Sequence, residues 1–328
     1  MVEMSKWERV EAALAGAAVD RPPVSLWHHF PEQDQTAKAL ANATLAWQER
    51  YDNDFIKFMP PGDYATIDWG LTSEYRGDQS GTRATTHYPI ATADDWRRIA
   101  PIPVDRGMHR EVIEAARLTN ERLGGAAPLL QTVFSPLTTA MKLSDGRVLD
   151  HLRERPDIVH EALATITAVT RAMTAATLER GASGIFFATQ CATTDLMSVA
   201  AYAEFGERYD RQVLDAAGAS RFTMLHIHGE NIMFDALMAY PVHALNWHDR
   251  RTTPALAEGI QRSGKCAIGG IHEYDIATMT PDEAAAQTRD TVAATGGAHM
   301  MVGPGCVIPI TTPPATIAAV IRAVRGER

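Results

Sequence analysis

Eight short apolar runs, each followed by a segment of helical periodicity, limit what this chain can fold into. Such alternation is typical of parallel sheets, because a parallel connection must cross back over the sheet, usually as a helix. Eight units favour an α/β fold of the closed (β/α)8 TIM-barrel type over an open doubly wound sheet. The predicted strands are 24–27, 55–59, 128–133, 184–188, 222–226, 244–247, 267–271 and 300–302.

The length of 328 residues predicts a single barrel domain over 1–328. A helix-like segment at 6–17 precedes the first predicted strand and is interpreted as an N-terminal extension. The stretch 65–103 fits neither the strand nor the helix period, and we interpret it as an insertion near the barrel mouth. Neither a second domain nor an internal repeat is expected.

Charge and composition exclude several classes of partner. A net charge of -9 argues against nucleic acid, which requires a basic surface. Residues 1–9 are polar, and no window approaches the roughly eighteen apolar residues of a membrane span, so we expect a cytoplasmic protein without a membrane segment. Three cysteines are too few for a disulfide framework, which also suits the cytosol.

Polar side chains gather directly after the predicted strands. In such barrels the active site is built from loops at the carboxyl ends of the strands, so these residues predict a ligand-rich cup. The members of this cup that we expect to contact a small-molecule substrate are His28, His29, Asp63, Tyr64 and Gln190.

Two segments near the end of the chain carry candidate metal ligands. His226 and His228 stand at i and i+2 of one predicted strand, so both point to the same face, and Cys306 follows the last predicted strand. Catalytic zinc is usually held by three such donors with a fourth position left open. The pattern therefore predicts a zinc site, against the alternative of a hydrogen-bonded His pair and a small buried thiol.

Other strand-end residues have open roles. His248 and His272 either complete the metal shell or act as general acid and base near neutral pH. Glu230 and Asp249 are expected to orient ligating imidazoles. Cys191 is either a further ligand or a reactive thiol.

Several segments spread along the chain carry a family resemblance: 20–24, 135–136, 155–157, 181–185, 225–231, 269–271 and 303–309. With them the chain resembles the uroporphyrinogen decarboxylase superfamily and, within it, the zinc-dependent methyltransferases linked to corrinoids. The resemblance implies a (β/α)8 barrel and a methyl-transfer reaction in which zinc activates a thiol or a similar nucleophile.

The resemblance also implies specific ligands. In the methyltransferase branch a His-x-Cys pair and a distant Cys bind zinc; His226 matches that His, Cys306 matches the distant Cys, and His228 stands where the family has its middle Cys. The replacement keeps a zinc donor but removes a negative charge. Because the chain carries no corrinoid-binding module of its own, a cobalamin methyl carrier would sit on a separate corrinoid protein.

Three alternatives remain at this point. A decarboxylase would bind the carboxylates of its porphyrinogen through arginines, and the matching segment 27–34 contains none. A zinc-dependent lyase or hydrolase acting on a small substrate keeps the metal and changes the reaction. The third alternative is a protein that has the barrel fold but no enzymatic activity and serves as a subunit or as a corrinoid-binding partner.

Overall fold

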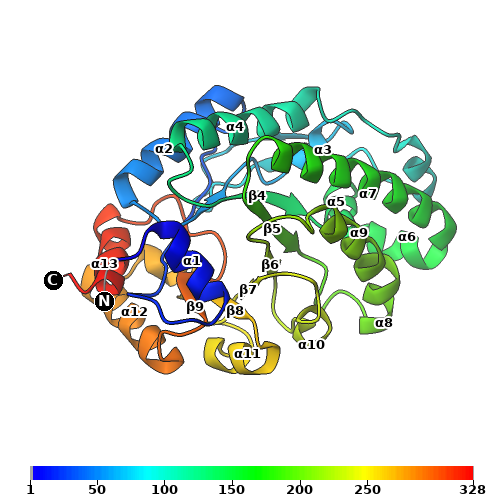
Figure 1. Cartoon of the computed structure of the whole chain (residues 1–328). Helices are drawn as coiled ribbons and strands as arrows, with labels where there is room; N and C mark the ends of the chain where they lie inside the picture. Colours follow the sequence, from blue (N-terminus) through cyan, green and yellow to red (C-terminus); the bar gives the residue numbers. More distant parts are fainter. Residues whose placement is uncertain (1–2, 328) are drawn as a thin grey trace.

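A curled parallel sheet lies at the centre of the computed structural model, which describes residues 3–327, and helices surround it (Figure 1). The sheet has seven strands in the order β1-β4-β5-β6-β7-β8-β9, and neighbouring strands are parallel. Each of these strands coincides with one of the predicted runs. Their bounds are β1 Ile56–Phe58, β4 Leu129–Phe134, β5 Gly184–Thr189, β6 Met224–Ile227, β7 Ala244–Trp247, β8 Cys266–Ile271 and β9 Met300–Pro304.

The predicted strand at 24–27 is wrong as a regular strand, because only an isolated parallel bridge from Val24 to Val302 forms there. The preceding Pro22 and Pro23 have no N–H to donate to a ladder. The N–H groups of Val24 and Leu26 donate to side chains, the carboxylate of Asp54 and the amide of Asn53. The segment nevertheless lies between the two edge strands, and we call it the seam.

Backbone hydrogen bonds join the seam to both edges of the sheet. On the β9 side, Ser25 N donates to Val302 O and Val302 N donates to Pro23 O. On the β1 side, Asp54 N donates to Val24 O. The seam therefore connects the first and last strands of the sheet, although it contributes few ladder bonds of its own.

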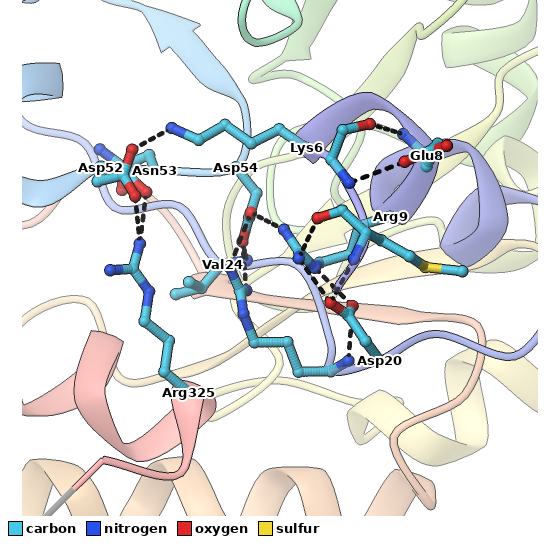
Figure 2. A network of polar contacts seen from close by, with 12 residues as sticks. Lys6, Glu8, Arg9, Asp20, Val24, Asp52, Asn53, Asp54 and Arg325 are labelled. Atoms are coloured by element: carbon cyan, nitrogen blue, oxygen red, sulfur yellow. Dashed lines mark hydrogen bonds and ion pairs between the residues drawn. The ribbon is translucent and has the colours of Figure 1, made fainter. Parts of the chain in front are cut away.

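A buried ion-pair network holds the seam in place (Figure 2). The Asp54 carboxylate is fully buried and accepts from Arg9 at 2.7 Å, from Arg21 at 2.6 Å and from Val24 N at 2.8 Å. Arg9 also binds both oxygens of Asp20. Two arginines and a backbone N–H thus converge on one carboxylate, so its charge is compensated within the fold.

Helices follow the strands as the barrel pattern predicts. Helix α12, for example, begins with a capping box between Thr280 and Glu283 and ends at Gly296 in the left-handed conformation. None of the helices within residues 3–327 combines the length and apolarity required to cross a bilayer. The longer helices are α2 Ala37–Tyr51, α4 Gly107–Leu123, α5 Pro136–Leu143, α7 Pro156–Glu179, α9 Arg208–Ala216, α11 Leu256–Ser263, α12 Pro281–Thr295 and α13 Pro314–Arg325.

Shorter helices fill the remaining connections: α3 Tyr64–Ile67, α6 Val148–Glu154, α8 Val199–Tyr202 and α10 Phe234–Leu237. A π-helical turn at Ala203–Glu207 separates α8 from α9. It interrupts an otherwise continuous helical run from Val199 to Ala216.

Helix α1, Lys6–Leu14, is the predicted N-terminal extension and covers the amino ends of the strands. Trp7 donates to Gly125 O ahead of β4, Glu11 pairs with Arg221 ahead of β6, and Leu14 O contacts the His299 ring ahead of β9. Helix α1 therefore contacts the segments that lead into β4, β6 and β9.

The stretch 65–103 contains an antiparallel hairpin, β2 Thr72–Glu74 and β3 Ala84–His87, followed by a 3-10 turn at Ala93–Arg98. Its loop lies at the opposite, carboxyl end of the strands, since Gln79 O accepts from Ile310 N and Thr82 shares a cavity with Cys306. The predicted insertion near the barrel mouth is present.

The buried network at the seam yields a stability prediction. Asp54→Asn leaves Arg9 and Arg21 without their shared buried anion, and we expect a loss of about 3 kcal/mol in the free energy of unfolding. Asp52→Asn is the matched control, because this neighbour is 59% exposed in its side chain and binds Lys6 and Arg325 at the surface, where the cost stays below about 1 kcal/mol. Chemical denaturation measures both; equal losses would contradict the assigned role of Asp54.

Candidate metal centre

Four side chains at the carboxyl ends of β6, β7 and β9 meet at the barrel mouth. His226 lies in β6, His228 directly follows β6, His248 directly follows β7, and Cys306 lies two residues beyond β9. One donor atom of each lies within 4.8 Å of all the others. The structure thus brings together the three predicted zinc ligands and adds His248 to them.

The spacing within this cluster suits a small ion. His228 Nδ1 lies 3.1 Å from His248 Nε2 and 3.8 Å from Cys306 Sγ. Two nitrogens bound at 2.0–2.1 Å to a tetrahedral zinc lie roughly 3.3 Å apart, and a zinc-bound sulfur lies slightly further away. The donor set, imidazoles with a thiol, is also one that zinc prefers.

The ring of His226 is oriented by a neighbour on β7. Its Nδ1 lies 2.6 Å from Asn246 Oδ1, and the Asn246 amide nitrogen donates to Ile268 O and Pro304 O. Those two carbonyls fix the Asn246 oxygen toward His226, so His226 Nδ1 carries the proton and Nε2 carries a lone pair. Nε2 is buried and has no hydrogen-bond partner within the described part of the chain, as a metal-ligating nitrogen would be before it binds an ion.

His248 is oriented in a similar way by Glu273. Its Nδ1 lies 2.6 Å from Glu273 Oε1, which also accepts from Arg251 at 2.9 Å. Burial raises the pKa of Glu273, but the hydrogen bonds from His248 and Arg251 outweigh this and bring the pKa to about 2. Glu273 is therefore ionised, and His248 presents Nε2 to the cluster.

A glycine allows the last strand to approach this close. A Cβ at Gly305 would lie 2.9 Å from Glu273 Oε2 and 3.0 Å from both Trp247 O and His248 Cα. Only glycine fits without displacing the ends of β7 and β8. Close packing at the site therefore requires glycine at the position before Cys306.

Burial controls the protonation of the donors. It lowers the pKa of His226 well below the usual value and lowers that of His228 to about 4, with a further lowering from His248. Burial raises the pKa of the Cys306 thiol to about 11. At neutral pH, without an ion, His226 and His228 are therefore neutral imidazoles and Cys306 is a thiol.

A cavity of about 100 Å³ adjoins the cluster and is lined by both His226 and Cys306. His29, Gln190 and Lys57 also line it. It shares three wall residues, Gly62, Thr82 and Lys142, with an outer cavity of about 320 Å³. A small molecule in the inner cavity would therefore contact the candidate metal ligands directly.

The other predicted site residues lie in different places. Asp63 lines the outer cavity, whereas Tyr64 is buried and donates to Thr132 O. His28 packs edge-on against Trp47 and does not line either cavity. His272 lies outside the cluster, and its Nδ1 accepts from the backbone of Tyr274 and Asp275.

Cys191 is likewise outside the cluster; it is buried against Met141, and burial raises its pKa to about 12. The expected orienting residues differ as well. Glu230 pairs with Arg251, and Asp249 accepts from Gly270 N, so neither contacts a clustered imidazole.

Sequence reasoning assigned no role to Asn246, Glu273, Lys57 or Lys142. Lys57 carried a detectable signal, since it is a charged residue inside the apolar run 55–59. Asn246 is similarly a polar residue inside the strand 244–247. Their significance depends on which strands become neighbours, here β6 with β7 and β1 with β4.

Comparisons with known proteins cover almost the entire chain. A methylcobamide:CoM methyltransferase of Methanosarcina barkeri (strain Fusaro) is 25% identical over 342 aligned residues, 98% of each chain. A uroporphyrinogen decarboxylase of Nitrosomonas europaea is 27% identical over 66% of this chain and 64% of its own. Among solved structures, a methyltransferase from Methanosarcina mazei superposes with a TM-score of 0.86 at 20% identity over 99% of both chains, which shows a shared fold.

Family assignment agrees with these relatives. Residues 5–327 match the family described as Uroporphyrinogen decarboxylase (URO-D). The match includes the seam, all seven strands of the central sheet and the four-residue cluster. The chain therefore belongs to the uroporphyrinogen decarboxylase family.

Proposed function

We propose that this protein is a zinc-dependent methyltransferase in which His226, His228 and Cys306 hold the metal and activate a substrate thiol, or a similar nucleophile, to accept a methyl group. In the reverse direction the methylated product would donate it. The observation that carries the proposal is the buried Nε2 of His226, which lacks a partner among residues 3–327 and faces two further donors. A desolvated lone pair without a partner is unfavourable unless an ion occupies the space before it.

Zinc bound to these side chains would lower the pKa of a coordinated thiol, so that a thiolate forms at neutral pH. The chain's own residues would perform the remaining tasks. Asn246 keeps His226 in the ligating tautomer, and the apolar walls of the inner cavity, such as Phe134 and Phe186, limit access of water. His248 takes the proton that the thiol releases, and the ionised Glu273 stabilises the resulting imidazolium.

The similarity to methylcobamide:CoM methyltransferases supports a corrinoid as the methyl donor. Methylcobamide:CoM methyltransferases match this chain over nearly its full length, which supports a methylcobamide carried by a separate corrinoid protein as donor or acceptor. His228 stands where the methyltransferase pattern has Cys. Because neutral imidazole replaces a thiolate, the centre would be a stronger Lewis acid, so hydrolysis or elimination is the second candidate reaction. Product analysis with and without methylcobamide distinguishes the two.

The first prediction concerns the distant ligand. Cys306→Ser removes the only thiol of the cluster, and we expect stoichiometric zinc and methyl transfer to be lost together. Cys266→Ala is the matched control, since Cys266 is buried at the start of β8 and outside the cluster, and it should retain both. Metal analysis by mass spectrometry and a methyl-transfer assay give the readout. A fully active, zinc-free Cys306→Ser protein would refute the proposal.

The second prediction separates proton transfer from metal binding. His248→Gln should retain zinc near one equivalent, because three donors remain, while methyl transfer to the thiol, which no longer has a base to take its proton, falls by about 10²–10⁴-fold. Arg251→Lys is a control for the surrounding charge, since it keeps a cation beside Glu273. Loss of zinc from His248→Gln would instead identify His248 as a fourth ligand.

The third prediction concerns ring orientation. Asn246→Ala removes the acceptor that fixes His226, and we expect the Kd for zinc to rise about 10–100-fold with little change in the folded structure. Competition with a chromophoric chelator measures the Kd, and circular dichroism monitors the fold. An unchanged Kd would show that Asn246 does not orient a ligand.

A further inference from the structure

A buried carboxyl group lies in the helical layer and is not part of the metal cluster. Asp210 in α9 is 0% exposed. Two tyrosine hydroxyls donate to its Oδ2, from Tyr202 in α8 at 2.6 Å and from Tyr240, which follows α10, at 2.9 Å. Its Oδ1 is buried and has no hydrogen-bond partner within residues 3–327. One oxygen of this carboxyl group is thus fully used, whereas the other is free.

No cation compensates this carboxyl group. Within the described part of the chain, no lysine, arginine or histidine nitrogen forms an ion pair with Asp210, whereas the equally buried Asp54 pairs with both Arg9 and Arg21. A buried carboxylate without a cation is unfavourable, and uptake of a proton removes its charge.

The ionisable groups nearest to Asp210 are acidic or neutral. They are Glu207 in the π-helical turn, Cys191 after β5 and the two tyrosines. Arg211, the next residue of α9, pairs with Glu207 and lies over the Tyr240 ring, 5.3 Å from its centre. None of these groups places a positive charge against the Asp210 carboxyl group.

The other helices packed against α9 direct their basic groups elsewhere. On α7, the His160 ring contacts the Tyr209 hydroxyl and Glu204. On α5, Lys142 donates to Gly62 O. Burial, with a smaller effect from Glu207, therefore raises the pKa of Asp210 to about 6, against the lowering effect of its hydrogen bonds.

Ser135 provides an acceptor for such a proton. It precedes α5 as the N-cap residue, but its hydroxyl does not cap the helix, and its buried Oγ has no hydrogen bond of standard geometry among the described residues. It nevertheless lies close enough to Asp210 to lower the pKa of that carboxyl group. Because Oδ2 already accepts two hydroxyls, a proton on Oδ1 would be free to donate to Ser135 Oγ.

The hydrogen bond between Tyr202 and Asp210 bridges an irregular part of the helical layer. The π-helical turn Ala203–Glu207 separates the two residues, and such turns often occur at functional sites. A Cβ at Gly206 would lie 2.6 Å from the Tyr202 ring, so glycine allows this ring to cross the turn and reach Asp210. Asp210 thus connects α8 and α9 across the turn and lies beside the start of α5.

We propose that Asp210 is a proton-operated switch: in mildly acidic solution its protonated carboxyl group joins α8, α9 and the start of α5, and its ionisation at higher pH loosens this contact. One proton passes between solvent and Oδ1, and no other reactant takes part. Helix α5 also carries Met141 and Lys142, which line the outer cavity, so the switch acts on packing behind that wall. It involves none of the metal ligands and is independent of the proposed function.

The first test measures stability against pH. The pKa of Asp210 in the fold, about 6, lies above its usual value of 3.8, so protonation stabilises the fold at low pH and this contribution is lost as the pH rises through about 6. Asp210→Asn keeps the shape of the neutral group and cannot titrate. We expect the ratio of the unfolding equilibrium constants of the unmodified protein and Asp210→Asn to rise about tenfold between about pH 5 and about pH 8.

Chemical denaturation gives these constants, and Asp215→Asn is the matched control. Asp215 is exposed on the same helix, α9, so its replacement should leave the ratio to the unmodified protein independent of pH. A ratio for Asp210→Asn that is also independent of pH would overturn the proposal.

Hydrogen exchange locates the effect within the fold. Relative to Asp210→Asn, which corrects for the intrinsic pH dependence of exchange, the unmodified protein should lose amide protection in α8, the π-helical turn, α9 and the start of α5 as the pH rises. Identical changes of protection in both proteins would contradict the switch.

A third measurement observes the proton directly. Carbon-13 NMR of the aspartate side chains follows the titration, and the resonance of Asp210 is the one that Asp210→Asn lacks. Its midpoint should lie near pH 6 in the unmodified protein. Tyr240→Phe removes one donor to Oδ2, which favours the ionised form, so it should move the midpoint upward by about one pH unit. A midpoint near the usual 3.8 in the unmodified protein would refute the switch.

Discussion

The buried carboxylate of Asp54 is the interaction on which the closure of this barrel depends. The segment between β9 and β1 begins with two prolines and cannot form a full ladder, so side chains replace part of the backbone pairing. Asp54 and Asn53 bind the N–H groups of Val24 and Leu26, and Arg9 and Arg21 compensate the carboxylate. A compensated buried charge of this kind fixes geometry where hydrogen-bonded strands would normally do so.

The order of the strands in the sheet brings the candidate site together. The four members of the cluster lie in or just beyond three strands, β6, β7 and β9, and the order β6-β7-β8-β9 brings the ends of these strands close together. Glu273 after β8 then orients His248 after β7, and Asn246 on β7 orients His226 on β6. The site residues therefore lie in strands or within two residues of a strand end, which favours a fixed geometry.

Much of this arrangement could be predicted from the sequence, because apolar periodicity and strand-end position are local properties. They identified the strands of the sheet and brought His226, His228 and Cys306 to one place. Prediction failed where the outcome depended on tertiary pairing. The seam was predicted as a strand, but its Val24 N–H donates to the Asp54 carboxylate instead of to a neighbouring strand. His272 was predicted at the site, but its Nδ1 accepts a hydrogen bond from Tyr274 N. Lys57 could not be assigned before its neighbours were known.

The seam also links two parts of the molecule that would otherwise be treated separately. Trp27 is the last residue of the seam and lines the inner cavity together with residues of β5 and β6. The position of that wall is set by how tightly Val24 and Leu26 are held, and hence by a carboxylate that no ligand touches. Reshaping the cavity for a new ligand would therefore require Asp54 and Asn53 to be redesigned together with the residues that line it.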